Sequence, residues 1–358
     1  MSVIAKVFRD WLPHDKRPLS REQRQAANAI CKCRTPAMEH GSLYLCPDCG
    51  QKHFAWHSCG NRNCPQCGCN KVAQWLEKRQ DEMLPVNYYM VTFTLPHEFN
   101  YQCKVNPKEM FKTFFKSSSE ALKKVAGYKN ILNGNIGMMG TLQTWARDGS
   151  YHVHIHYIVP GVALEGNKES LRFPKNSDYL MPMQILQKVF KAKFIDELRN
   201  LEFYDSVVPK AWCKDWIVHC QSVGNGQAAI KYLSAYTQKI FISGKRIEYD
   251  GENVTYSYID SNTGQKRKRT VHALKFIFLY LQHVLPSGFM KTRRYGLMAN
   301  ASKKILKSIR ELLEIRWGRR LIKQEKFAIN VYKCKKCSGE LKMASPRLRA
   351  PPKDALIL

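Results

Sequence analysis

The chain has 358 residues, of which 44% are hydrophobic, so it can form two or three domains with real cores and is not globally disordered. Lysine and arginine total 58 against 29 aspartates and glutamates, which gives a formal net charge of +29. Such an excess opposes compaction by self-repulsion unless a polyanion neutralises it, and nucleic acid is the natural partner because its binding releases counterions. A non-catalytic nucleic-acid binder has the same charge, so charge alone does not indicate an enzyme.

No targeting or membrane segment is evident in the sequence. Met1 to Arg17 is mixed and charged, without the apolar stretch of a signal peptide. The longest apolar run, Leu274 to Leu285, is shorter than the roughly 20 residues of a membrane span and carries Lys275 and His283. We therefore expect a cytoplasmic protein with no membrane partner. Its 13 cysteines would stay reduced there, so clustered pairs indicate metal ligands rather than disulfides.

A short helix and a cysteine-rich segment are expected at the N-terminal end. Residues 20–33 predict the helix, because Ser20 with Gln23 three positions later is a capping-box pattern. Two CxxC pairs follow, separated by 14 residues, which is close to zinc-ribbon spacing. Each pair can place two thiolates on a tetrahedral Zn²⁺, and four protein ligands leave no open position for chemistry. The sequence thus predicts one structural zinc held by Cys46, Cys49, Cys64 and Cys67.

The remaining cysteines and histidines leave the number of zinc ions open. One hypothesis is a second zinc with nearby ligands, while the alternative is ordinary buried thiols and surface histidines; the residues concerned are Cys33, His40, His57 and Cys59. Near the C-terminus, Cys334-x2-Cys337 is half of a site. Other cysteines such as Cys213 or Cys220 could complete it, and the alternative is an exposed pair without zinc.

The middle of the chain predicts an antiparallel α+β unit. The run from Val86 to Leu95 is rich in β-branched and aromatic residues and predicts a buried strand, ended by Pro96. Two further strands are expected at 136–146 and 151–159, since Asp148-Gly149 between them is a strong hairpin signal. Helical patterns cover residues 70–84, 107–126, 182–199 and 227–240.

The C-terminal third predicts a basic β-hairpin at 245–271 around Ser261 to Gly264, then mostly helical structure as far as Ile329. The tail after Met343 is Pro-rich and expected to be frayed. The basic side chains of the hairpin and of the following helix are candidates for contacts with DNA phosphates, and the alternative is solvated surface charge. These side chains are Lys266, Arg267, Lys268, Arg269, Lys303, Lys304 and Lys307.

Three histidines alternate along the run from Tyr151 to Val159. Strand side chains alternate between faces, so His152, His154 and His156 should project to one side and the intervening apolar residues to the other. Three histidines on one face would repel one another if protonated. They make sense as neutral ligands of a cation or as a solvated strip, and their position on a hydrophobic strand favours the metal.

The hairpin register adds a fourth residue to this face. If Asp148-Gly149 is a two-residue loop, Trp145 faces His152, Gln143 faces His154 and Thr141 faces His156. Directly opposed residues lie on the same face of a sheet. Gln143 can therefore offer its amide oxygen beside the histidines, although a bulge would shift this register.

Two tyrosines are four residues apart in the helical pattern at 227–240. Residues i and i+4 share a helical face, so Tyr232 and Tyr236 can be two nucleophiles that act in turn. The alternative is an aromatic stripe packed on the core. Lys239, on the same face, can help to lower a phenol pKa or bind phosphate, or can be a surface charge.

These features, in this order, resemble the HUH-type, two-tyrosine transposases of rolling-circle insertion sequences. The resemblance covers nearly the whole chain, and the co-occurrence of motifs is more specific than any one of them. The motifs are CRTPA from Cys33, SCGNRNCPQC from Ser58, FTLPHE from Phe93, QTW from Gln143, HVHIHYIVPG from His152, YLSAYT from Tyr232, HVLPSGF from His283 and RRYGLMAN from Arg293.

The resemblance implies an HUH endonuclease core on an antiparallel sheet. His154 and His156 would be the HUH ligands of Mg²⁺ or Mn²⁺, and Tyr232 and Tyr236 the paired tyrosines. Gln143 stands where relatives often have histidine, which makes it a substituted third ligand, with His152 as the alternative. The implied activity is nicking and rejoining of single-stranded DNA at transposon ends and target through a 5′-phosphotyrosine.

The combined expectation is a bacterial-type DNA-acting enzyme with an α+β fold: residues 1–84 form an N-terminal helix and zinc module, 85–243 the catalytic domain, 244–343 a helical and β extension and 344–358 a flexible tail. Host replication proteins are candidate partners. Two alternatives remain at this point: a replication initiator or relaxase with the same chemistry, or a non-catalytic zinc-containing DNA-binding protein.

Overall fold

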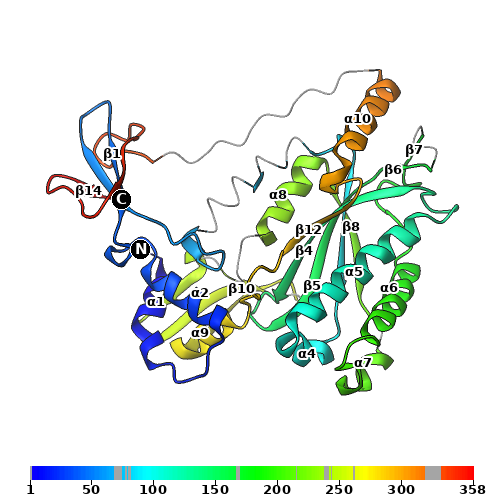
Figure 1. Ribbon diagram of the computed structural model, residues 1–358, viewed down its shortest axis with the longest axis horizontal. Helices are drawn as coiled ribbons and strands as arrows, with labels where there is room; N and C mark the ends of the chain where they lie inside the picture. Colours follow the sequence, from blue (N-terminus) through cyan, green and yellow to red (C-terminus); the bar gives the residue numbers. More distant parts are fainter. Residues whose placement is uncertain are drawn as a thin grey trace.

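A seven-stranded sheet forms the centre of the computed structural model (Figure 1), with strand order β7-β6-β4-β5-β3-β8 and with β12 also pairing with β4. Its strand pairs are antiparallel, and helices cover both faces, so the predicted α+β class is confirmed. Its strands are β3 (Tyr88–Thr94), β4 (Asn135–Trp145), β5 (Tyr151–Pro160), β6 (Ala163–Leu164), β7 (Leu171–Arg172), β8 (Val218–Gly224) and β12 (Thr292–Gly296).

The structure describes residues 2–67, 75–76, 79, 82–166, 170–214, 216–237, 242, 244–260, 263–318 and 332–358. The helix expected at 70–84 falls mostly outside this set, as do Lys239 and the turn residues Ser261 and Asn262. Within it, no helix combines the length and the apolar character that crossing a membrane requires.

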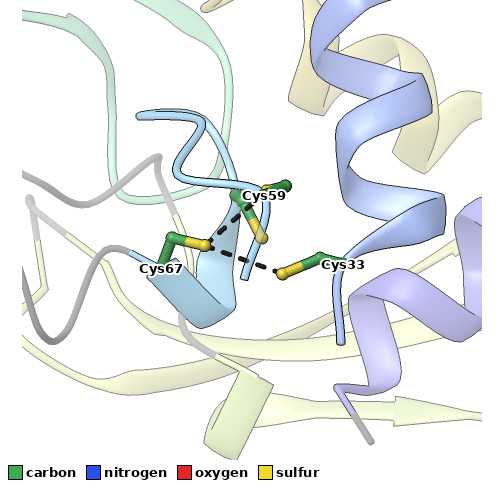
Figure 2. Close-up of side chains that lie close together, drawn as sticks. Cys33, Cys59 and Cys67 are labelled. Atoms are coloured by element: carbon green, nitrogen blue, oxygen red, sulfur yellow. Dashed lines mark hydrogen bonds between the residues drawn. The ribbon is translucent and has the colours of Figure 1, made fainter. Parts of the chain in front are cut away.

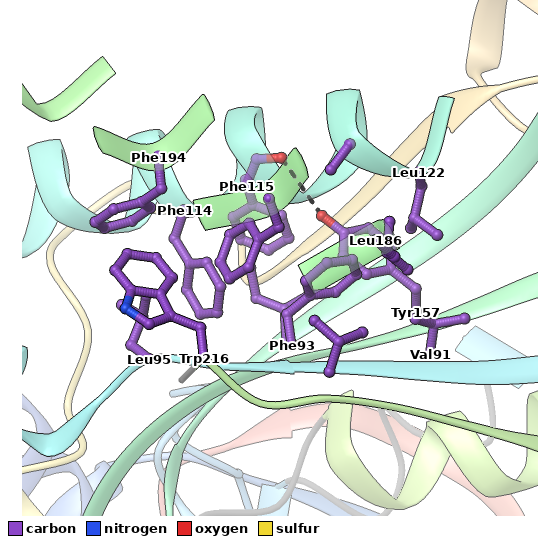
Figure 3. Close-up of a cluster of buried hydrophobic side chains, with 14 of the residues drawn as sticks. Val91, Phe93, Leu95, Phe114, Phe115, Leu122, Tyr157, Leu186, Phe194 and Trp216 are labelled. Atoms are coloured by element: carbon purple, nitrogen blue, oxygen red, sulfur yellow. Dashed lines mark hydrogen bonds between the residues drawn. The ribbon is translucent and has the colours of Figure 1, made fainter. Parts of the chain in front are cut away.

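One face of the central sheet is apolar and is covered by helices α5 (Pro107–Ala126) and α6 (Met183–Leu198), with α4 (Asn100–Val105) and α7 (Lys210–Cys213) at its end. Phe93 and Tyr157 point from β3 and β5 into this layer and meet Trp216 and aromatic side chains of the helices (Figure 3). Burial of such a side chain contributes about 1.5–3 kcal/mol. The Tyr157 hydroxyl lies 2.8 Å from that of Ser118, so its polar end is satisfied inside the core.

The opposite face carries helices α8 (Gly226–Thr237) and α10 (Lys303–Trp317). Leu233 of α8 and Leu313 of α10 pack in one cluster with Met139 and Ile158 of the sheet. The two faces therefore have separate cores, and the alternating side chains of each strand belong to one or the other.

A second unit joins segments that lie far apart in the sequence. Helices α1 (Val3–Trp11) and α2 (Arg21–Lys32) pack on α9 (Ala273–Leu281) and on a three-stranded sheet of β9 (Ile247–Tyr249), β10 (Asn253–Ile259) and β11 (Lys266–His272). The predicted capping box begins α2, since Gln23 N donates to Ser20 Oγ and Ser20 N donates to Gln23 Oε1. The predicted domain boundaries place α1 and α2 in one domain and β9 to α9 in another, but burial of their shared hydrophobic core unites these segments. β12, which was expected in the C-terminal extension, joins the central sheet instead.

A third sheet combines both ends of the chain, in the order β13-β1-β2-β14. β1 (Gly41–Leu45) and β2 (Lys52–Trp56) form a hairpin, β13 (Lys342–Leu348) pairs antiparallel with β1, and β14 (Leu356–Ile357) pairs parallel with β2. The prediction of a flexible tail at 344–358 is therefore wrong. Backbone pairing orders this segment, and composition alone carries no signal for a partner 300 residues away.

Candidate active site and zinc centres

Strand β5 presents its histidines on the face opposite the aromatic core. His154 and His156 are buried, with 7% and 8% of their surfaces exposed, and His152 is half-buried. The ring centroids of His154 and His156 are 4.7 Å apart, and those of His152 and His154 are 5.2 Å apart. The predicted cluster of three histidines is thus present, on a strand that has a neighbour on each side.

The predicted pairing of Gln143 with His154 and of Thr141 with His156 is confirmed, but by a different turn. Ala146 N donates to Ser150 O, so the loop has three residues, with Gly149 at φ +84° rather than a two-residue loop. A bulge then places two residues of β5 opposite Thr144, which restores the register. Between turn and bulge the prediction is wrong, because Trp145 pairs with Tyr151 and not with His152.

The amide of Gln143 is oriented by its own strand. Its Nε2 donates to Trp145 O at 3.0 Å, while its Oε1 is buried and has no hydrogen-bond partner among the described residues. A buried oxygen without a partner costs free energy, and a cation at this position would satisfy it. Gln143 therefore fits the third position of a metal site beside His154.

Burial sets the protonation state of the three histidines. Desolvation lowers the pKa of His152, lowers that of His154 well below its usual value, and lowers that of His156 to about 3. The rings are therefore neutral at neutral pH, which is the form that binds metal.

Hydrogen bonds hold the rings through Nδ1. Nδ1 of His154 lies 3.2 Å from His152 O, and Nδ1 of His156 lies 2.9 Å from Thr92 Oγ1. A carbonyl oxygen only accepts, so His154 carries its proton on Nδ1 and presents a lone pair at Nε2. A contact of this kind orients a metal-binding histidine.

Thr92 was not singled out from the sequence. It lies opposite His156 on β3, and on its other side it pairs with the exposed His219 of β8. A signal was present, since Thr92 and Thr94 are alternate polar residues in an otherwise apolar strand. His219 had no comparable signal, because only the β3–β8 pairing brings it to this face.

Helix α8 lies across the histidine face, in contact with β3, β4, β5 and β8 (Figure 1). It follows β8 directly and starts at Gly226, against Tyr88 at the first residue of β3, so it runs back along β3. Ile230 and Leu233 of α8 pack in one hydrophobic cluster with Ile158, which lies two residues from His156 on β5. The predicted packing of this helix beside the histidine strand is therefore confirmed.

The structure describes the side chain of only one of the two predicted tyrosines. Tyr232 is exposed over 37% of its surface, so its ring is not enclosed in the apolar core. Tyr236 belongs to α8, one turn further on, and its side chain lies outside the described residues. Their role as nucleophiles stays a prediction.

Four cysteines converge at the C-terminal end of α2: Cys33 follows the helix, and Cys59, Cys64 and Cys67 come from the loop after β2. Figure 2 labels Cys33, Cys59 and Cys67. Their sulfurs all lie within 4.8 Å of one another, and Cys67 Sγ is 3.6 Å from those of both Cys33 and Cys59. Tetrahedral zinc with bonds of about 2.3 Å requires sulfurs about 3.8 Å apart.

The predicted division of the ligands is therefore wrong. The pair Cys46 and Cys49 does not join Cys64 and Cys67 but lies beside Cys334 and Cys337. The suggested second site is correct in Cys33 and Cys59 but wrong in its histidines. The ring of His57 instead lies within hydrogen-bond distance of Ser42 Oγ and Pro346 O, and His40 is in neither cluster. Spacing along the chain cannot reveal which CxxC pairs meet in space.

Two family models match this chain. The model described as "Transposase zinc-binding domain" matches residues 3–95, which include all four cysteines at the end of α2. The model described as "Putative transposase" matches residues 137–305, which include the histidine strand and helix α8. Over these two segments the chain is similar to transposases of the IS91 family. The zinc-binding domain and its cysteine cluster together support a structural Zn²⁺.

Two relatives are transposases by name. The "Putative transposase y4qJ" of Sinorhizobium fredii is 29% identical over 306 residues, which is 79% of this chain and 76% of the relative. The "Transposase for insertion sequence element IS801" of Pseudomonas savastanoi pv. phaseolicola is 23% identical over 274 residues, which is 72% of this chain and 66% of the relative. No solved structure matches the chain.

The four basic residues of the β10–β11 hairpin that are expected to contact DNA differ in their surroundings. Lys266, Arg267 and Lys268 are exposed on β11, whereas Arg269 is half-buried. Arg269 Nη1 donates to Asp148 O at 3.0 Å, and the hydroxyl of Tyr256 donates to the same oxygen at 2.8 Å. The β10–β11 hairpin therefore holds the turn that connects β4 to the histidine strand.

The structural zinc can be tested by removing one ligand. We expect Cys59→Ser to lose the zinc of this cluster and to lower Tm by about 5 °C or more, because metal binding is folding free energy in such sites. Metal analysis and thermal unfolding measure the two effects. Cys213→Ser, an exposed cysteine outside both clusters, is the matched control and should leave both unchanged. Equal zinc content in the two variants would contradict the assignment.

Proposed function

We propose that this protein nicks and rejoins single-stranded DNA at transposon ends through a 5′-phosphotyrosine intermediate. Members of the IS91 family act by rolling-circle transposition. The observation that carries the proposal is the shared face: Gln143, His154 and His156 lie together on the sheet, and the tyrosine-bearing helix α8 packs over the same strands. Cation ligands and nucleophiles brought to one surface from distant parts of the chain are what phosphoryl transfer requires.

His154, His156 and Gln143 would hold Mg²⁺ or Mn²⁺, with His152 as the alternative third ligand. The fit rests on the neutral, buried rings and on the unpartnered Oε1 of Gln143. Three neutral ligands suit a weakly held, exchangeable ion. When bound, such an ion polarises the scissile phosphate and offsets the charge that grows in the transition state.

The tyrosines would supply the nucleophile. The phenol oxygen of one tyrosine forms a bond to phosphorus as the bond from phosphorus to the 3′ oxygen breaks. The phenol loses its proton, the 3′ oxygen gains one, and the 5′ phosphate remains on the tyrosine. Rejoining is the reverse, with a 3′ hydroxyl as nucleophile. A second tyrosine allows another strand to be cleaved while the first covalent intermediate persists.

The covalent intermediate gives the decisive test. With labelled single-stranded DNA carrying a transposon end and Mn²⁺, we expect a covalent adduct that mass spectrometry maps to Tyr232 or Tyr236. Adduct formation should fall to background in Tyr232→Phe/Tyr236→Phe, in His154→Ala and in EDTA, while DNA binding persists, since the double variant loses only hydroxyls. Tyr101→Phe, at an exposed tyrosine on α4, is the control that should react as the native protein does. An adduct on the double tyrosine variant would eliminate the nucleophile assignment.

Thr92 offers a second test, which separates positioning from folding. Thr92→Val keeps the side-chain shape and strand preference but removes the hydroxyl that lies beside His156 Nδ1. We expect the Mn²⁺ concentration for half-maximal nicking to rise about 10–100-fold, the range for partners of metal-binding histidines, with partial recovery at high Mn²⁺. Thr92→Ser should restore the native requirement. Equal Mn²⁺ requirements in the valine and serine variants would exclude this role.

DNA binding by the hairpin predicts a change in salt dependence. Lys266→Gln/Arg267→Gln/Lys268→Gln should lower the slope of log K against log salt by about 0.7 for each single-strand phosphate that the protein no longer neutralises. A matched variant replaces three exposed lysines on the α5–α6 side, Lys129, Lys175 and Lys188, and removes the same charge. Its slope should stay native if the hairpin is the contact surface. Equal slopes for the two variants would instead indicate a nonspecific effect of net charge.

A further inference from the structure

We propose that Cys46, Cys49, Cys334 and Cys337 form a second structural zinc site, which fastens the C-terminal segment 332–358 to the N-terminal β1–β2 hairpin. Two of these ligands lie beyond residue 305, where neither family model reaches, and the other two lie in the zinc-binding domain without completing its first cluster. The site is separate from the DNA chemistry proposed above, so its test requires no measurement of DNA cleavage.

The sulfur atoms are placed as a tetrahedral zinc requires. Sγ of Cys46 is 3.4 Å from that of Cys337, Sγ of Cys49 is 3.7 Å from that of Cys334, and all four lie within 4.8 Å of one another. These separations match the 3.6 Å found in the cluster at the end of α2. They lie slightly below the value of about 3.8 Å expected from zinc–sulfur bonds of about 2.3 Å.

The two CxxC segments also share one backbone conformation, although they come from opposite ends of the chain. In the first, Gly50 N donates to Cys46 O at 2.9 Å and Cys46 N to Gln51 O at 3.0 Å. In the second, the corresponding bonds are Ser338 N to Cys334 O at 2.9 Å and Cys334 N to Gly339 O at 2.8 Å.

The residue after the second cysteine is left-handed in both segments, with φ of +70° at Gly50 and +65° at Ser338. A serine rarely adopts this conformation, so the second turn needs a compensating interaction. Two matching knuckles that face each other with their thiols inward are the arrangement in which each pair supplies half of a zinc site.

Polar groups around the sulfurs fit thiolates rather than disulfides. Lys336 N donates to Cys334 Sγ at 3.4 Å, and Nε2 of the fully buried His53 lies 3.2 Å from the same sulfur. His53 lies outside the group of four ligands, so its contact is that of an outer partner, which orients a ligand and stabilises its charge.

The surrounding core is too small to hold this unit without metal. Its buried hydrophobic cluster consists of Cys46, Cys334 and Leu341, with Tyr44 and Tyr332 packed partly against them. Units of this size depend on metals or disulfides for folding, and metal binding then supplies the folding free energy. Zinc at this site would hold β13 on β1 and β14 on β2.

Native mass spectrometry of the full-length protein, purified from cytosol under reducing conditions, tests the site. We expect two zinc ions per native chain and one in Cys334→Ser/Cys337→Ser, whose residues 332–358 trypsin should then remove while the rest resists as in the native protein. The control Cys31→Ser/Cys213→Ser, outside both clusters, should keep two. Cys337→His should also keep two, since zinc accepts imidazole, and this variant separates ligand loss from misfolding.

One zinc in the native protein, or two in Cys334→Ser/Cys337→Ser, would overturn the proposal. So would a native mass that is lower by the hydrogens lost in disulfide formation, because the cysteines would then be paired covalently.

Discussion

The pairing register of β4 with β5 is the constraint on which the candidate site depends. Strand side chains alternate between faces, so a slip of one residue would turn His154 and His156 into the aromatic core and expose Val153 and Ile155. The free energy of burying that core therefore selects the face on which the histidines lie. The same register puts Gln143 opposite His154, and the turn beyond it is held by hydrogen bonds from the β10–β11 hairpin.

Burial of the histidines keeps their rings neutral, and the neutral ring is the form that can bind a cation. The protein has a net charge of +29, yet its histidine face is lined by groups that burial keeps neutral. A polyanion is attracted by exposed lysines and arginines, whereas a cation needs lone pairs without competing protons. Under the proposed function, this separation lets exposed basic residues attract DNA while the buried histidine face binds a positive ion. Helix α8, which bears Tyr232 and Tyr236, packs over the strands of the histidine face.

The two cysteine clusters differ in how far apart their members lie along the chain. The cluster at the end of α2 joins a helix to a loop nearby in sequence, whereas the other unites residues 46–49 with residues 334–337. The first cluster borders the extensive hydrophobic core that α1, α2 and α9 share, whereas the second has only a small apolar core around it. The proposed zinc at the second cluster would therefore contribute more to the order of the segments that it joins.

Local patterns in the sequence determined the elements of this protein. Alternation identified β5 and its histidine face, helical periodicity identified α5, α6 and α8, and a capping box identified the start of α2. The facing of Gln143 and His154 was also predicted, although a longer turn and a compensating bulge produce it. Only the tertiary structure decided which CxxC pairs meet, that residues 342–348 pair with β1, and that Thr92 contacts His156. Spacing and periodicity report contacts within one element or one hairpin, whereas these contacts join segments whose separation along the chain says nothing about their distance in space.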